Sequence, residues 1–303
     1  MGTEDTTDTE VSVSEAFPSP EGRRVIMSTD SIPTQLGRIH VRHEGSGPPV
    51  VLWHSLFVDS ASWGPLFDRV SEDHRAIAID GPCHGRSDGL THDFTFDEVA
   101  DCAVAVMDAL ALDGPVDWVG SAWGGHIGIK VAARHPRRLR TLTTIGTPLR
   151  PISPRERWTM CWPLVQIYRV TGPNRWLRTQ LQNALIGPRT AGAHPDRACE
   201  IMRAFVDADR RPMFHAMRSM MLHRPDVTAD LASIAVPTLM MVADADSMGA
   251  GPDDIHSATS AMSHVHVGGL VGDGHLTPLI VDQDNIYRQL VGHWSGNYAD
   301  SRS

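Results

Sequence analysis

Short runs of apolar residues alternate along the chain with segments in which apolar positions recur every three or four residues. The first pattern is typical of buried strands and the second of helices. Strands are predicted at Arg38–His43, Val50–His54, Arg75–Asp80, Val116–Gly120, Thr141–Gly146, Thr238–Ala243 and Ser263–Val267. Helices are predicted at Phe96–Leu112, His126–Arg134 and Asn285–Trp294. This alternation predicts an α/β fold with a mostly parallel central sheet that helices cover on both faces.

The alternation stops between Pro148 and Pro225, where the sequence has a helical pattern, frequent proline and several large apolar residues. A helical insertion between two strands predicts a cap over the sheet. Residues 1–22 are polar and acidic and lack the features of a signal peptide, so we expect a mobile tail. We therefore predict a tail of residues 1–22, a core of residues 23–147 and 229–298, and a helical cap of residues 148–228.

Composition narrows the classes of partner and site. The net charge is −9, from 27 basic and 36 acidic residues, which argues against a nucleic-acid partner. No run of about 18 apolar residues occurs, so we expect no transmembrane helix and no membrane partner. The four cysteines form no CxxC pair and the 16 histidines show no tight ligand spacing, so no metal and no cofactor is expected. Reduced cysteines favour a cytoplasmic protein, and the oligomeric state is not readable.

The most specific motif is the sequence from Val116 to Gly125, in which an apolar strand runs into Gly-Ser-Ala-Trp-Gly-Gly and then into a helix. This is the pattern of a nucleophile elbow, a sharp turn that projects its central side chain above a sheet. Small flanking residues let the strand and the helix approach each other closely. The central residue here is Ala122, which has no nucleophilic atom, where serine is expected.

Two candidate partners follow in the order typical of a catalytic triad. Asp246 lies after the predicted strand Thr238–Ala243 and is the expected acid, with Asp244 as the fallback. His275 lies in the glycine-rich sequence Gly272-Asp273-Gly274-His275 and is the expected general base. The order nucleophile, acid, histidine is that of α/β-hydrolases.

An earlier loop, which begins at His54 and contains Ser55, Leu56 and Asp59 before Trp63, completes the pattern. Over about residues 24–294 the chain resembles capped α/β-hydrolases, and this loop is similar to that of 3-oxoadipate enol-lactonases and related esterases. The resemblance implies that the backbone N–H groups of Leu56 and Trp123 form an oxyanion hole. It also implies a small-molecule ester or lactone as the substrate.

Other residues near these motifs are candidates for contact with the substrate. They comprise one residue of the oxyanion loop, two histidines close to the motifs and four large residues of the cap: Ser55, His84, His126, Trp158, Trp162, Tyr168 and Met220. Several arginines in the cap could pair with a substrate carboxylate, although solvated positions are the ordinary role of such residues.

Three explanations of Ala122 remain open. The chain can be a variant in which serine was replaced and substrate is bound but not turned over, which the retained Asp246 and His275 favour. It can be a natural ligand-binding protein without activity on a hydrolase scaffold. It can also derive from an enzyme with an aspartate nucleophile, such as an epoxide hydrolase or haloalkane dehalogenase. The sequence His54-Ser55-Leu56-Phe57 and the single cap tyrosine, Tyr168, argue against the third explanation.

Overall fold

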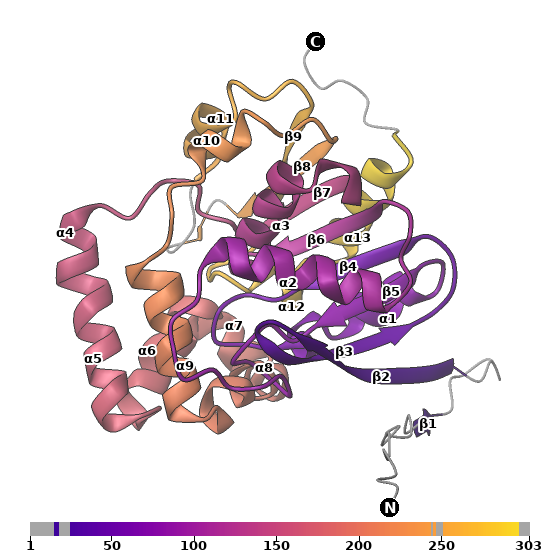
Figure 1. The fold of residues 1–303 in the computed structure, drawn as a ribbon. Helices are drawn as coiled ribbons and strands as arrows, with labels where there is room; N and C mark the ends of the chain where they lie inside the picture. Colours follow the sequence, from indigo (N-terminus) through magenta and orange to yellow (C-terminus); the bar gives the residue numbers. More distant parts are fainter. Residues whose placement is uncertain (1–14, 18–24, 244, 247–250, 297–303) are drawn as a thin grey trace, which may run out of the picture.

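The computed structural model describes residues 15–17, 25–243, 245–246 and 251–296 (Figure 1). Within these residues nine strands form one sheet in the order β1-β2-β3-β5-β4-β6-β7-β8-β9. The strands are β1 (Glu15–Phe17), β2 (Val25–Thr34), β3 (Gly37–Glu44), β4 (Pro49–Trp53), β5 (Arg75–Ile79), β6 (Val116–Ser121), β7 (Leu139–Ile145), β8 (Thr238–Ala243) and β9 (Val265–Leu270). The strands β1, β2, β3 and β5 pair with one another in that order and are antiparallel. From β5 onward, through β4, β6, β7, β8 and β9, all pairs are parallel.

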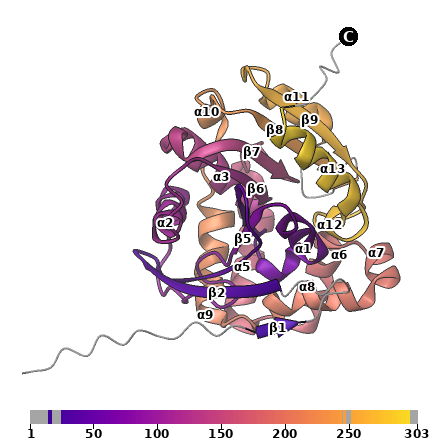
Figure 2. The same ribbon diagram turned by 90° about the vertical axis from the view of Figure 1, so that its right-hand side faces the viewer.

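Helices cover both faces of this sheet (Figure 2). The helices α2 (Phe96–Ala109) and α3 (Trp123–Arg134) lie on one face, and α1 (Pro65–Ser71) and α13 (Gln283–Trp294) lie on the other. Every residue of β6 and β8 is buried, as expected for parallel strands covered on both sides. Shorter elements of the core are η1 (Ser60–Trp63), η2 (Pro136–Arg138), α11 (Pro252–Ala258) and α12 (Pro278–Val281).

The long connection from β7 to β8 is helical. It contains α4 (Pro154–Glu156), η3 (Arg157–Cys161), α5 (Trp162–Thr171), α6 (Arg175–Leu185), α7 (Pro188–Ala193), α8 (Pro195–Asp207), α9 (Arg210–Met217), η4 (Arg218–Leu222) and α10 (Thr228–Leu231). The segments η3 and η4 are π-helical. In Figure 1 the helices α4, α5, α6 and α9 stand to the left of the sheet. The interior of this helical segment includes Val165, Tyr168 and Phe205. The rings of Tyr168 and Phe205 lie 5.5 Å apart.

Several element boundaries differ from those predicted. Helix α3 begins at Trp123, three residues earlier than predicted, because Gly124 and Gly125 carry no apolar side chain that would reveal the periodicity. Helix α2 stops at Ala109 because Ala111 adopts the left-handed conformation, with φ 54°. Within the predicted tail, Glu15–Phe17 forms a strand that pairs with β2, and the rest of residues 1–22 lies outside the described residues.

No helix of the described residues has the length and apolar composition needed to cross a bilayer.

Candidate active site

The turn between β6 and α3 has the backbone geometry of a nucleophile elbow. Its central residue, Ala122, has φ 47° and ψ −101°, a conformation that L-residues rarely adopt. The surrounding backbone holds it there: the Ala122 N–H donates to the Ile145 carbonyl oxygen at 2.8 Å, and the Ala122 carbonyl accepts from the N–H groups of Gly125 and His126. Strain that is retained in this way is typical of functional sites.

Two glycines of the motif are required by close contacts of the backbone. A Cβ atom on Gly120 would collide with the backbone of Gly124 and Gly125, where strand and helix cross. A Cβ atom on Gly124 would collide with the carbonyl oxygen of Trp53 at the end of β4. The motif read from the sequence is therefore explained by steric contacts around the elbow.

Asp246 and His275 lie together at the carboxyl ends of β8 and β9. The Nδ1 atom of His275 lies 2.8 Å from Oδ2 of Asp246, and the two side chains are 5% and 3% exposed. A carboxylate at Nδ1 favours the tautomer with the proton on that nitrogen, which leaves Nε2 able to accept a proton. The fallback acid, Asp244, lies outside the described residues.

The cap contributes to the position of this histidine. The backbone N–H groups of His275 and Leu276 donate to the carbonyl oxygens of Ala184 and Leu185 at 3.2 and 2.6 Å. These carbonyls belong to the end of α6, so the last turn of a cap helix anchors the loop that carries the predicted base. The sequence gives no sign of this contact, because the two segments are about ninety residues apart.

The two predicted oxyanion donors line the same cavity as Ala122 and His275. Among the described residues, the backbone N–H groups of Leu56 and Trp123 have no hydrogen-bond acceptor. An unpaired N–H that faces a cavity can bind a substrate oxygen. The arrangement can therefore stabilise negative charge that develops beside the elbow.

Two buried histidines hold the loop that contains Leu56. Nε2 of His54 accepts from the Gly81 N–H at 2.8 Å, and Nδ1 lies 2.7 Å from the Ser55 carbonyl oxygen. Nε2 of His84 accepts from the Phe57 N–H at 3.4 Å, and its Nδ1 lies 2.9 Å from the Pro82 carbonyl oxygen. Each ring therefore donates at one nitrogen and accepts at the other, which requires the neutral form.

Burial lowers the pKa values of these histidines far below the usual 6.5. The pKa of His54 falls to about 4, and that of His84 falls to about 3 through burial and the neighbouring His54. Burial and the charge of Arg224 lower the pKa of His126 to about 3. The Nδ1 and Nε2 atoms of His126 lie 3.0 and 2.8 Å from the carbonyl oxygens of Ala122 and Pro148, where the elbow meets the start of the cap segment.

These histidines make stability dependent on pH. Because their folded pKa values lie below the unfolded value, the stability they confer is complete above pH 6.5 and is lost as the pH falls toward 4 and 3. Near pH 5 the three histidines together lower the free energy of unfolding by about 4 kcal/mol for each pH unit of acidification. Burial raises the pKa of Asp59 to about 6, and this opposite shift offsets the contribution of about one histidine. Urea unfolding at pH 7 and pH 5 measures this.

The variant His84→Gln is expected to reduce that slope by about 1.4 kcal/mol per pH unit. Replacing the exposed His92 in His92→Gln is expected to leave it unchanged. Equal slopes in the original chain and in His84→Gln would contradict the assignment of a neutral, buried His84.

A cavity of about 640 Å³ lies between the sheet edge and the cap. Of the predicted substrate-contact residues, Ser55, His126 and Met220 line it, together with Leu56, Ala122, Trp123 and His275. Its apolar wall comes mainly from η3, α5, α6 and η4 and includes Met160, Leu164, Ile167, Trp176 and Met221.

Four predicted contact residues lie elsewhere. His84 packs against His54 and Trp123, with ring centroids 5.0 Å from each, and lies behind the oxyanion loop. Tyr168 is fully buried inside the cap, against Phe205. Trp158 and Trp162 line a separate surface groove. The segment η3 and helix α5, which carry these two tryptophans, direct other side chains to the cavity, such as Met160 and Leu164.

The cavity wall includes four charged residues that were not predicted from the sequence: Arg150, Glu156, Arg224 and Asp254. Arg150 pairs with Glu156 at 2.6 Å. Arg224 donates from Nη2 to the Arg150 carbonyl oxygen at 2.6 Å, and among the described residues it forms no ion pair. Burial lowers the pKa of Arg224, with a smaller effect of the neighbouring Arg150 and Arg157. Nothing in the local sequence of Arg224 distinguishes it from the other arginines of the chain.

Comparison with known proteins identifies the fold. Residues 48–188 match the family profile described as alpha/beta hydrolase fold. An enol-lactonase from Burkholderia xenovorans superposes with a TM-score of 0.79 at 21% identity, covering 88% of this chain and all of that one. A thermophilic esterase from Thermogutta terrifontis superposes with a TM-score of 0.77 at 23% identity, covering 89% and 98%.

The segments that align with curated relatives by sequence are shorter than the structural superpositions. A 2-hydroxymuconate semialdehyde hydrolase from a Pseudomonas species is 35% identical over 104 residues, which are 34% of each protein. The chain likewise aligns with only 37% and 40% of the length of two other curated relatives. The matched family profile includes the elbow, and the superpositions extend over most of the chain. The chain therefore has the α/β-hydrolase fold, and its residues 48–188 resemble the family of that name in sequence.

Proposed function

We propose that this fold serves a serine hydrolase of carboxylic esters or lactones, and that the chain is its nucleophile-to-alanine form, which binds substrate without turning it over. The observation that carries the proposal is the strained turn at Ala122. It faces a cavity that also holds two unpaired N–H groups and a histidine paired with a buried carboxylate. The names of the enol-lactonase and esterase neighbours agree with this class of reaction.

With serine at position 122, the proposed reaction has two stages. The hydroxyl oxygen attacks the carbonyl carbon while Nε2 of His275 takes its proton, and the oxyanion is held by the N–H groups of Leu56 and Trp123. His275 then returns the proton to the leaving alkoxide oxygen, which leaves an acyl-enzyme. A water molecule attacks the acyl carbon and gives its proton to Nε2 of His275, which passes it to the serine oxygen as the bond to the acyl carbon breaks and the acid is released. Asp246 keeps the imidazole oriented and stabilises its cationic form.

The direct test is Ala122→Ser, assayed with p-nitrophenyl esters and simple lactones. Turnover with either class is the expected result. Absence of a gain with both classes, in a folded variant that still binds ligand, would favour the second function: a ligand-binding protein on a hydrolase scaffold, which the alanine itself supports. An aspartate nucleophile with epoxide chemistry fits less well, because Tyr168 lies inside the cap and does not line the cavity.

The charge of the cavity suggests which substrates fit. Since Glu156 already pairs with Arg150, Arg224 is a cation in the wall without an acidic partner among the described residues. A partly buried guanidinium, such as that of Arg224, is stabilised by an anion that replaces lost hydration. We therefore propose that the preferred ester or lactone carries a carboxylate, which binds at Arg224.

In the Ala122→Ser background, Arg224→Gln is expected to lower kcat/KM for a carboxylate-bearing ester by about 10–100-fold, because a hydrogen bond to a charged group contributes about 1.5–3 kcal/mol. The loss for a neutral ester of the same size is expected to be small. Arg155→Gln, at an exposed position of the cap, is the matched control. Equal losses on the acidic and the neutral ester would contradict the carboxylate site while leaving the hydrolase proposal intact.

A further inference from the structure

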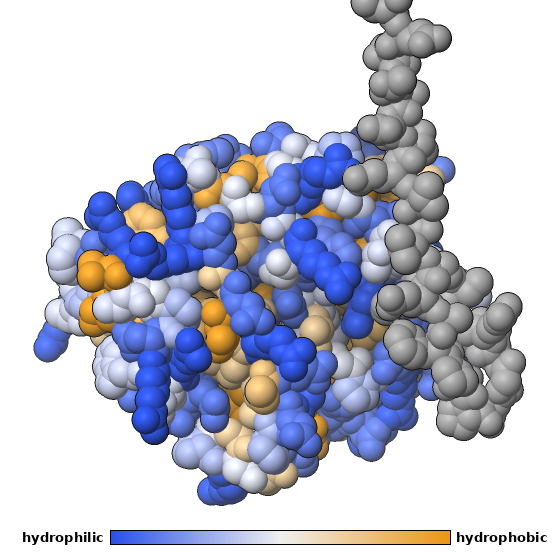
Figure 3. Space-filling view, turned by 90° about the horizontal axis from the view of Figure 1, so that it is seen from below, coloured by the Kyte–Doolittle hydropathy of each residue, from blue (hydrophilic) through white to orange (hydrophobic). Residues whose placement is uncertain are grey.

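The outer surface of the cap exposes an unusual number of large apolar side chains. Six of the nine most exposed large hydrophobic residues in the described part of the chain come from η3, α5 and α6. They are Trp158 (66% exposed), Met160 (67%), Trp162 (44%), Ile167 (37%), Val170 (74%) and Trp176 (55%). In Figure 3, hydrophobic residues reach the surface on the left of the view, where the cap lies, among hydrophilic ones. Exposed apolar groups gathered in this way mark a surface of interaction.

The same surface is basic in an acidic protein. Between Pro148 and Ile186 there are six arginines and a single acidic residue, Glu156, whereas the whole chain has a net charge of −9. Glu156 is already paired with Arg150. Four of the arginines are exposed beside the apolar residues: Arg155, Arg169, Arg175 and Arg178. We refer to these four arginines and the six apolar side chains together as the cap face.

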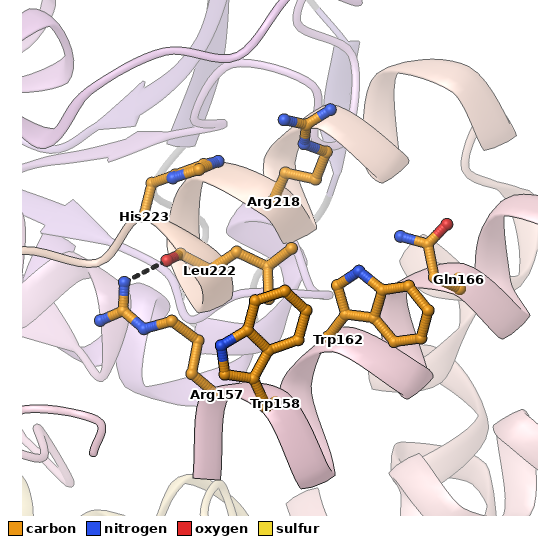
Figure 4. A pocket seen from close by; sticks show the side chains of 7 residues that line it. All are labelled: Arg157, Trp158, Trp162, Gln166, Arg218, Leu222 and His223. Atoms are coloured by element: carbon orange, nitrogen blue, oxygen red, sulfur yellow. Dashed lines mark hydrogen bonds between the residues drawn. The ribbon is translucent and has the colours of Figure 1, made fainter. Parts of the chain in front are cut away.

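A groove on the cap face is open to solvent. It measures about 430 Å³ and is lined by Trp158 and Trp162, whose ring centroids are 6.1 Å apart, and by residues of η4 across from them. Figure 4 shows the two indoles side by side, with Arg218 and His223 on the opposite wall. Arg157 closes one end through a hydrogen bond to the Leu222 carbonyl oxygen.

The cap face continues into the cavity of the candidate active site. Met160, Ile167 and Trp176 are exposed to solvent and also line that cavity. A surface docked on the cap face would therefore lie against an entrance to the cavity. This continuity distinguishes the cap face from a scatter of exposed apolar residues.

We propose that the cap face docks on the surface of an anionic lipid bilayer and presents the cavity to it. Tryptophan is favoured at the level of the lipid headgroups, and arginine is attracted to anionic lipid while its apolar stem packs beside it. No spanning segment is needed for such docking, so it is compatible with the absence of a transmembrane pattern in the sequence. The proposal departs from the expectation, drawn from the sequence, of no membrane partner; that expectation rested on the absence of a long apolar run.

The test is cosedimentation of the full chain with vesicles of phosphatidylcholine, with and without phosphatidylglycerol, together with the tryptophan emission spectrum. We expect binding and a blue shift of the emission with the anionic vesicles alone. Each of Arg155→Gln and Arg175→Gln is expected to weaken the partition about five-fold. The double variant Trp158→Ser/Trp162→Ser is expected to weaken binding and reduce the blue shift, while Trp176 remains to report what binding is left.

Arg137→Gln and Val281→Ser are matched controls, since both residues are exposed outside the cap face and should not affect binding. Unfolding midpoints of all variants are measured, so that a misfolded variant is recognised and replaced by the single change Val170→Ser. Equal binding to neutral and anionic vesicles, or no binding, would overturn the proposal. So would a dimer in sedimentation equilibrium that Trp158→Ser/Trp162→Ser dissociates, because the cap face would then join two copies of the chain.

Discussion

Replacing Ala122 by serine is expected to raise kcat/KM for a suitable ester or lactone by about 10⁴–10⁶-fold over the original chain. The expected gain is large because the other groups of the proposed machinery are already present. The turn holds position 122 at φ 47°, and His275 lies 2.8 Å from the carboxylate that orients it. Serine differs from alanine by one oxygen atom, so the fold needs no further adjustment. Initial rates with and without the substitution measure the effect.

A matched control tests whether the gain in turnover requires a hydroxyl at the elbow or can come from a hydroxyl elsewhere in the cavity. Ala184→Ser also adds a hydroxyl to a residue that lines the cavity, but on α6 and not on the elbow, and should leave turnover at background. Ser121, the residue before the elbow centre, is buried, does not line the cavity, and within the described part of the chain has no partner for its hydroxyl. Turnover in the original chain that Ser121→Ala removes would contradict the assignment of position 122.

In the Ala122→Ser background, Asp246→Asn is expected to lower kcat by about 10⁴-fold. An amide at this position can donate to Nδ1 of His275 and so favour the tautomer that cannot accept the hydroxyl proton at Nε2. The buried contact between the two side chains would otherwise be kept. Steady-state rates of the two variants with the same ester measure the loss.

Asp244→Asn is the matched control, because the sequence alone left the choice between these two aspartates open. A loss of kcat smaller than about ten-fold is expected, since it is Asp246 that accepts the hydrogen bond of His275 Nδ1. A larger loss from Asp244→Asn than from Asp246→Asn would reverse the assignment.

Seven of the nine described strands and the elbow were predictable because their patterns are local, whereas β1 and β2 were not predicted. The strand β8 matches the predicted range, and the glycines around Ala122 indicate a turn in which two backbones nearly touch. The spacing of Asp246 and His275 follows from the strands that precede them. A local pattern of this kind is preserved whatever the remainder of the chain does.

The faces of the cap helices were not predictable in the same way. The π-helical segment Arg157–Cys161 departs from the ordinary periodicity, so that Trp158 and Trp162 face outward while Met160 reaches the cavity. Apolar residues also occur on several sides of this helix, and Tyr168 is one that packs inward. The role of His84 depends on a hydrogen bond to the loop 27 residues earlier, which no local pattern reveals.

The central claim is that the turn at position 122 is built to carry an acyl group. Mass spectrometry of the Ala122→Ser variant, quenched during turnover of a p-nitrophenyl ester, tests it most directly. The account predicts an added acyl mass on the peptide that contains position 122, and no such mass in the original chain. Turnover without an adduct, or an adduct at another residue, would contradict it.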